Sequence, residues 1–202
     1  KELKEIPSAD LYVYSNAWIY RGPEIIEEAR KMDKPVMSYF EALGQLARDY
    51  KVIAVSGTHG KTTTTAMLAE IMIEAGLDPT VLVGSFANKF SSNFRKGESG
   101  YLLVEADEYN RHFLNFHPYI GVVTNIEADH LDYYKDLADI KAAFDKFLLQ
   151  SERKISNYSK YLDKVPKLFV PGEHNRQNAA VALAVADVLK IPPDISQKAL
   201  SN

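Results

Sequence analysis

Apolar runs alternate along the chain with stretches of helical periodicity. Short runs rich in β-branched and aromatic residues predict strands, which lie at residues 10–15, 35–40, 51–56, 80–84, 101–106 and 119–125. Helices are predicted by their amphipathic spacing and Pro or Gly boundaries at residues 23–32, 41–50, 61–75, 137–149, 174–189 and 195–200. Residues 84–100 are polar and rich in Gly, Asn and Ser, which indicates a loop. Residues 151–171 are irregular and indicate no regular element.

The alternation of strands and helices predicts an α/β fold, with a mostly parallel sheet flanked by helices on both faces. Residues 1–48 resemble the latter half of an open α/β layer, so we expect the chain to start inside a first domain. Residues 49–202 would form a second domain. Ligands of parallel sheets gather at the carboxyl ends of the strands. Three of the predicted strands end in polar residues, which places a candidate site at this edge.

Composition and charge exclude several classes of protein. The chain has 202 residues and a net charge of −3, with acidic and basic residues interspersed. This pattern offers no polybasic surface for nucleic acid or a membrane. The absence of cysteine excludes a disulfide framework, a thiolate metal site and a cysteine nucleophile, and is compatible with the cytoplasm. No apolar run is long enough to span a bilayer.

The strongest chemical signal is the glycine loop in VIAVSGTHGKTTTT. Its strand–loop–helix context favours a phosphate loop over a chance Gly-Lys-Thr turn, although the general pattern would place a glycine at Val55. Backbone N–H groups at a helix start suit phosphate oxygens, Lys61 adds charge at the β- and γ-phosphates, and Thr62 offers a hydroxyl to Mg²⁺. No role for the His59 side chain follows. The candidate nucleotide-binding residues are Gly57, Thr58, His59, Gly60, Lys61, Thr62 and Thr63.

Two further strands end in groups that suit metal or substrate binding. Glu105 ends an apolar strand, where a carboxylate is costly unless it is hydrated or binds a cation such as Mg²⁺. Asp107 and Glu108 read equally well as solvent-facing loop acids. In TNIEADH, His130 is a candidate for a second cation or for orienting a ligand, and Asn125 for hydrogen bonding to substrate. Asp129 could hold His130 or cap the next segment.

The start of the predicted helix at 174–189 carries two amides. Asn175 and Asn178 are three residues apart and share a helix face. They could meet an adenine edge, because an amide pairs a donor with an acceptor, or Asn175 could simply cap the helix. The spacing by itself favours the cap.

Together, these stretches resemble the Mur ligases, ATP-dependent amide-bond-forming enzymes of peptidoglycan precursor synthesis. The resemblance is carried by GTHGKTTTTAML, LVEADEYNRHFLNFHPYIGVVTNIEADHLDYY and PGEHNRQNAAVALAVA. The family loop is the shorter Gly-x-x-Gly-Lys-[Thr/Ser], which accounts for Val55. Residues 1–48 are similar to the end of the family's Rossmann-like UDP-binding domain, and residues 49–202 to its central ATP-binding domain of P-loop type. The family's C-terminal domain is expected to be absent from this chain.

The resemblance implies roles for the candidate residues. Lys61 and Thr62 would hold Mg²⁺ and the phosphates of ATP. Glu105 would bind a metal, and His130 would lie at a second metal site. The resemblance also reverses the preference for a plain helix cap, because His174, Asn175 and Asn178 match the family motif near adenine. Lys61, Glu105 and His130 would then be the catalytic set. The implied reaction is the cytoplasmic joining of L-alanine to the carboxylate of UDP-N-acetylmuramate through an acyl phosphate.

Departures from the family pattern leave the added amine open. Tyr109 stands where the alanine-adding type usually has serine, and resembles instead the family member that attaches a recycled murein tripeptide. Phe144 fills the position of the carbamylated lysine of later Mur ligases, which suits the alanine-adding type. The sequence is also compatible with a nucleotide-binding module without turnover and with a regulatory nucleotide switch. The oligomeric state does not follow from the sequence.

Overall fold

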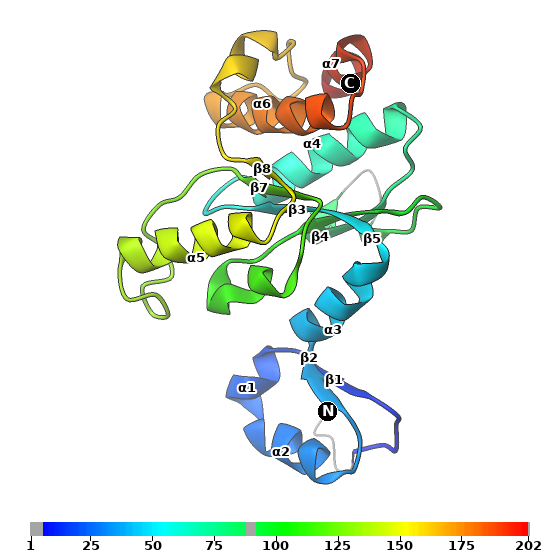
Figure 1. Ribbon diagram of the computed structural model, residues 1–202, viewed down its shortest axis with the longest axis vertical. Coiled ribbons are helices and arrows are strands. Elements are labelled where there is room, and N and C mark those ends of the chain that lie inside the picture. The colour runs from blue at the N-terminus through cyan, green and yellow to red at the C-terminus, as the bar shows by residue number, and fades with distance from the viewer. Residues whose placement is uncertain (1–5, 88–91, 202) are drawn as a thin grey trace. The chain divides into compact units, whose positions relative to one another are not determined.

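The computed structural model describes residues 6–87 and 92–201 (Figure 1). The chain divides into two compact units, residues 1–46 and residues 47–202. The sequence placed this boundary after residue 48. That the first unit is part of a UDP-binding domain stays a prediction.

The first unit contains a two-stranded parallel sheet with three helices. Its elements are β1 (Tyr12–Tyr14), α1 (Ala17–Arg21), α2 (Pro23–Lys31), β2 (Val36–Ser38) and α3 (Tyr39–Leu46). The strand expected at 35–40 ends early, at Ser38, because α3 begins at Tyr39. The Glu41 N–H donates to Ser38 Oγ (3.3 Å), and the Ser38 N–H donates to the Glu41 carboxylate (2.7 Å). This reciprocal capping box commits the following residues to helix.

The second unit is built on a six-stranded sheet in the order β5-β4-β6-β3-β7-β8. All neighbouring strands are parallel except β4 and β5. The strands are β3 (Lys51–Ser56), β4 (Thr80–Ala87), β5 (Ser92–Arg95), β6 (Tyr101–Glu105), β7 (Ile120–Val123) and β8 (Arg153–Ile155). The predicted α/β fold with a mostly parallel sheet is therefore confirmed.

The prediction of a loop at residues 84–100 is wrong for residues 84–87 and 92–95 and is confirmed for residues 96–100, whereas residues 88–91 lie outside the described part. β4 continues to Ala87, and β5 pairs with it in antiparallel orientation at the sheet edge. The Arg95 guanidinium holds this hairpin by donating to the Pro79 carbonyl (2.7 Å) and to the Asp78 carboxylate. An edge strand has one partner and little burial, so polar composition does not reveal it.

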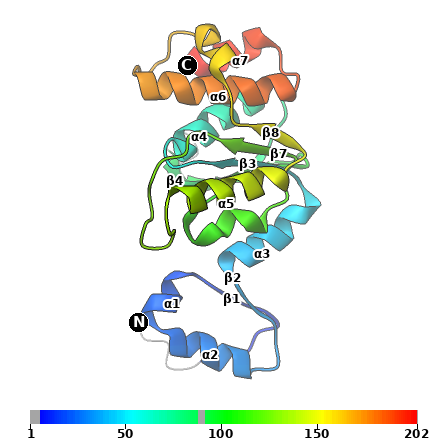
Figure 2. The ribbon, with the colours of Figure 1, turned by 60° about the vertical axis from the view of Figure 1, so that its left-hand side comes forward.

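Helices cover both faces of the sheet (Figures 1 and 2). α4 lies against one face and packs under α6 and α7, whereas α5 and the 3-10 helix η3 cover the other. Residues 151–171, irregular by sequence, contain β8 and η4. The bounds are η1 (Ala47–Asp49), α4 (Lys61–Glu74), η3 (Tyr109–Asn115), α5 (Leu137–Leu149), η4 (Ser159–Lys164), α6 (Glu173–Val188) and α7 (Pro193–Ser201). Within the described ranges, none of the helices combines the length and apolar character needed to cross a bilayer.

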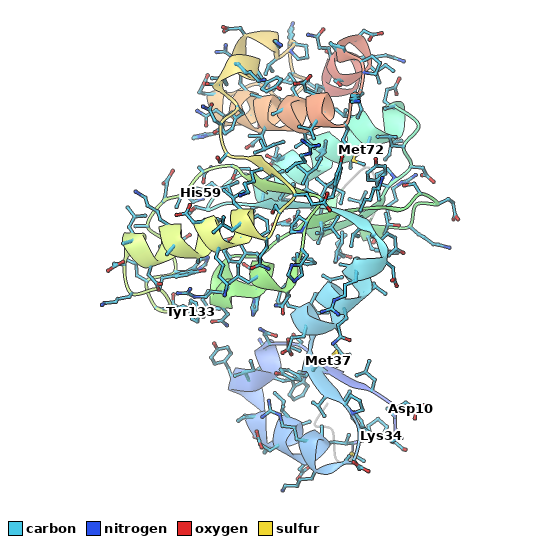
Figure 3. The ribbon with its side chains drawn as sticks, viewed as in Figure 1. Asp10, Lys34, Met37, His59, Met72 and Tyr133 are labelled. Atoms are coloured by element: carbon cyan, nitrogen blue, oxygen red, sulfur yellow. The ribbon has the colours of Figure 1, made fainter. Side chains whose placement is uncertain are left out.

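The core of this unit lies around α4, between the sheet and α6. α4 is buried on two sides, so it is apolar or small nearly all round, and Met72 (Figure 3) is fully buried. Parallel register aligns Val55 with Glu105, and Ser56 with Val123. The carboxyl ends of β3, β6 and β7 therefore meet at one edge, as the sequence predicted, and the loop that begins at Gly57 follows there.

Candidate functional site

The loop between β3 and α4 depends on two glycines with positive φ. Gly57 has φ +135° and Gly60 φ +81°. A Cβ on Gly57 would lie 2.1 Å from Thr124 Oγ1, and one on Gly60 would lie 2.3 Å from Asn178 Oδ1. Gly57 has no room for a side chain, at Gly60 the Asn178 amide would have to move, and both have backbone angles that glycine adopts without strain. The glycine spacing of the sequence therefore reflects close packing of this loop.

Residues after β7 hold the loop by its backbone. Asn125 Oδ1 accepts from the His59 N–H (2.8 Å), and Asn125 Nδ2 donates to the His59 carbonyl (3.1 Å). The Thr124 hydroxyl donates to the same carbonyl (2.6 Å), and Thr58 Oγ1 accepts from the Glu127 N–H (2.9 Å). The His59 side chain itself is 65% exposed, beyond the end of β3 (Figure 3). Asn125 is thus a support of the loop, and its role toward substrate stays a prediction.

Lys61 points back into the loop from the first turn of α4, a turn that also contains half-buried Thr63. Its Nζ donates to the carbonyls of Gly57 (2.7 Å) and Thr58 (3.3 Å) and to Glu108 Oε1 (2.9 Å). The ammonium is therefore fixed among the loop carbonyls and one carboxylate.

Glu108 is a site residue that the sequence did not single out. Its side chain is 3% exposed, and Oε1 lies 3.6 Å from His130 Nε2 in addition to its contact with Lys61. Burial raises the pKa of the Glu108 carboxyl, and the charge and hydrogen bond of Lys61 offset part of that rise. The reading as a solvent-facing acid is wrong for this residue. The only sign of Glu108 in the sequence was its place among three acids, Glu105, Asp107 and Glu108, at the end of a buried strand. That pattern does not tell which of the three side chains turns inward.

The neighbouring Asp107 is tied to its own segment. Burial opposes ionisation of Asp107, but hydrogen bonds from His112 Nδ1 (3.3 Å) and from the Tyr109 N–H (3.1 Å) outweigh it and lower the pKa of the carboxyl. The His112 side chain is itself buried, within η3. These contacts fix the turn that carries Glu108.

Glu105 and Thr62 form the candidate metal position. The Thr62 hydroxyl lies 2.9 and 3.1 Å from the two carboxylate oxygens of Glu105, and the Gly84 N–H donates to Glu105 Oε2 (2.7 Å). In the described part of the chain, no three His, Asp or Glu side chains gather as a metal-binding group. A hydroxyl beside one carboxylate at a phosphate loop fits Mg²⁺, which commonly takes its other ligands from phosphate and water.

His130 also lies near Glu108, and its backbone conformation is strained, with φ +53°. The Asp129 carboxylate accepts from the His130 N–H (2.7 Å), so Asp129 holds His130. The ring of Tyr109 lies against the His130 ring, with 5.0 Å between centroids. The structure thus groups His130 with Glu108 and Tyr109, and its metal role stays a prediction.

The polar residues at the start of α6 separate into three positions. Asn178 is 8% exposed and packs against Gly60. Asn175 Nδ2 donates to the carbonyls of Val170 (3.3 Å) and Pro171 (3.4 Å), whereas His174 is exposed. The N-cap of α6 is Gly172, without a side-chain cap, so the simple reading of Asn175 as the helix cap is wrong. Contact of these residues with adenine stays a prediction.

The packing of Gly84 against Glu105 gives a test of the metal position. A Cβ on Gly84 would lie 2.9 Å from Glu105 Oε2, so we expect Gly84→Ala to push the carboxylate away from Thr62. The Mg²⁺ concentration needed for half-maximal nucleotide binding should rise roughly ten- to a hundredfold, as for other changes to groups that orient metal ligands. Titration of nucleotide binding with Mg²⁺ measures this.

Gly100→Ala is the matched control, because a Cβ there meets nothing within 4 Å. Thermal unfolding of Gly84→Ala should change little, since the displaced atoms are the end of a flexible side chain. An unchanged Mg²⁺ dependence in Gly84→Ala would contradict the assignment of Glu105 as a metal ligand.

Comparison with known proteins identifies the relatives of this site. The family model of the Mur ligase middle domain matches residues 55–165. A UDP-N-acetylmuramate–L-alanine ligase from Clostridium botulinum is 53% identical over 146 residues, 72% of this chain and 32% of that protein. One from Clostridium tetani is 51% identical over 145 residues, 71% of this chain and 32% of that protein. The chain thus spans about a third of the length of these curated relatives.

Solved structures agree with this comparison. The UDP-N-acetylmuramate-alanine ligase of Thermotoga maritima is 27% identical with a TM-score of 0.77, covering 95% of this chain and 54% of that chain. The UDP-N-acetylmuramate:L-alanyl-gamma-D-glutamyl-meso-diaminopimelate ligase of Neisseria meningitides is 25% identical with a TM-score of 0.79, covering 96% and 78%. Because the family match runs over more than half of the sequence and includes the glycine loop, Glu105 and His130, this chain belongs to the Mur ligase family and carries its middle domain.

Proposed function

We propose that the protein containing this chain is an ATP-dependent ligase that joins L-alanine to the carboxylate of UDP-N-acetylmuramate in peptidoglycan precursor synthesis. The observation that carries the proposal is that Lys61 and the Thr62–Glu105 pair both lie at the edge where three parallel strands end. The identity to L-alanine ligases supports the choice of substrate. This chain would supply the site for ATP and Mg²⁺, and the reaction would take place in the cytoplasm with small-molecule substrates.

The side chains at the site fit phosphoryl transfer from ATP to a carboxylate. The loop offers backbone N–H groups at the start of α4, and the Lys61 ammonium would offset charge on the transferring phosphoryl group. Thr62 and Glu105 would hold Mg²⁺, which would supply positive charge to offset the negative charge of the phosphates. The carboxylate would attack the γ-phosphate and release ADP, and the amine would then attack the carbonyl of the acyl phosphate, forming the amide bond and releasing phosphate. Holding carboxylate and phosphate in line would supply much of the rate gain.

A second candidate differs only in the amine that is added. The Tyr109 hydroxyl donates to Asp132 (3.1 Å), and its ring covers one side of His130, so this tyrosine occupies space next to the site. The Neisseria meningitides relative, whose name includes a tripeptide, is similar in fold but only 25% identical. The far higher identity to L-alanine ligases favours L-alanine.

A substrate panel on the full-length protein tests the proposal. ADP release is measured with UDP-N-acetylmuramate, ATP and Mg²⁺, and with L-alanine, glycine, L-serine or the L-alanyl-γ-D-glutamyl-meso-diaminopimelate tripeptide as the amine. We expect the fastest release with L-alanine, and none without UDP-N-acetylmuramate or after chelation of the metal. Release with the tripeptide alone would establish the second candidate. Nucleotide binding without release for any amine would indicate a module or switch without turnover.

A further inference from the structure

All three N–H donors of the Lys61 ammonium are already engaged. An ammonium has three donors, and Lys61 Nζ donates to the Gly57 carbonyl, the Thr58 carbonyl and Glu108 Oε1 at 2.7, 3.3 and 2.9 Å. A phosphate that binds Lys61 must therefore replace one of these three acceptors as the partner of a Lys61 N–H. Among the three, only Glu108 carries a negative charge, as phosphate does.

The turn that carries Glu108 is rigid, so the Glu108 carboxylate cannot follow Lys61 far. The backbone carbonyl of Glu108 accepts hydrogen bonds from the Arg111 N–H (2.9 Å) and from the Tyr134 hydroxyl. The two residues that close the turn, Asn110 and Arg111, have φ of +51° and +57°. Such left-handed conformations in residues other than glycine persist only where the surroundings determine them. A movement of Lys61 toward phosphate would therefore lengthen its contact with Glu108.

Glu108 has few groups to replace Lys61. Its Oε2 is buried and accepts no hydrogen bond from the residues that the structure describes. Its Oε1 has His130 Nε2 at 3.6 Å, beyond hydrogen-bond distance. Lys61 is thus the principal partner of a carboxylate that is 3% exposed.

We propose that Glu108 is a positioning residue that competes with nucleotide phosphate for Lys61. It holds the lysine within the loop and sets how readily that lysine passes to a phosphate. The inference rests on the proposed nucleotide function of the loop and adds a residue that limits its affinity. It concerns the β- and γ-phosphates only, because these are the groups that Lys61 would contact.

Glu108→Gln tests the competition, because it removes the charge and nearly keeps the size. Dissociation constants for ATP, ADP and AMP are measured by calorimetry on this chain. We expect ATP and ADP to bind about tenfold more tightly than to the unmodified chain, the scale of one hydrogen bond between charged groups, and AMP to bind equally. When Glu108→Gln is added to a Lys61→Gln variant, no nucleotide should bind more tightly than it does to Lys61→Gln alone. A purely structural role would weaken all three nucleotides together.

Glu127→Gln is the matched control for a general effect of charge. Glu127 lies beside the same loop, 3.7 Å from His59 Nε2, but is 63% exposed and does not contact Lys61. An equal gain in Glu127→Gln would overturn the proposal, as would unchanged or weaker ATP binding by a folded Glu108→Gln. If thermal unfolding shows that Glu108→Gln does not fold, Glu108→Asp replaces it. Its shorter side chain draws the charge away from Lys61, so it should also bind ATP more tightly, and failure to do so overturns the proposal.

The outcome for the unmodified chain separates the two proposals. If it binds no nucleotide, the proposed nucleotide function of the loop fails, and this inference fails with it. If it binds ATP and ADP but Glu108→Gln gains nothing, only the inference on Glu108 is overturned.

Discussion

Lys61→Ala in the full-length protein is expected to lower ADP release on the order of a thousandfold, the scale of a lost charge at a transferring phosphoryl group. The substitution removes the cation that the loop holds 2.9 Å from Glu108 Oε1. Release of ADP with UDP-N-acetylmuramate, L-alanine and ATP is the measurement. A variant that keeps more than about a tenth of the turnover would contradict the assignment of Lys61.

The same substitution leaves Glu108 buried without its ion pair, which costs about 3 kcal/mol of stability unless the carboxyl takes up a proton. Lys61→Ala combined with Glu108→Gln removes the unpaired charge, so this double variant should regain stability in thermal unfolding without regaining ADP release. Lys96→Ala serves as the control for loss of a lysine, because the Lys96 side chain is 74% exposed. Its turnover should match that of the unmodified protein.

Gly57→Ala is expected to abolish nucleotide binding and to destabilise the fold by about 2–5 kcal/mol, from overpacking together with an unfavourable φ. Its Cβ would lie 2.1 Å from Thr124 Oγ1 and 3.0 Å from the Thr124 backbone nitrogen, at φ +135°. The backbone just after β7 cannot give way as a flexible side chain does, so the loop itself must move. Denaturant unfolding and calorimetry with ATP measure the two effects.

Two other glycines separate the causes. Gly76 has φ +72° but nothing within 4 Å of a Cβ, so Gly76→Ala should cost only the conformational strain, about 1–2 kcal/mol. Gly100→Ala has neither the positive φ nor a neighbour and should be near neutral. Both controls should bind ATP normally. If Gly57→Ala is no more destabilised than Gly76→Ala, close packing of the loop is not what requires glycine there.

The amino-acid sequence by itself determined the class of fold, most of its elements and the edge at which the site lies. Local periodicity was sufficient for β3 and α5, whose observed bounds equal the predicted ones. Apolar strands buried on both faces and amphipathic helices carry their signal within a few residues. The glycine loop was recognisable for the same reason, because its strand, its glycines and the start of its helix follow one another directly in the sequence. Edge strand β5 was not, because its polar composition carries no such signal.

Only the tertiary structure decided which side chains meet across the site. Lys61 and Glu108 are 47 residues apart in sequence, and the order β6-β3-β7 brings their loops together. The same order places Thr124 and Asn125 against the His59 backbone, and the packing of α6 on α4 places Asn178 against Gly60. Strand order and helix packing depend on contacts that are distant in sequence, so no local pattern encodes them. Hence the sequence predicted a phosphate loop with Lys61 in it, and the fold decided that Glu108 is the carboxylate that holds this lysine.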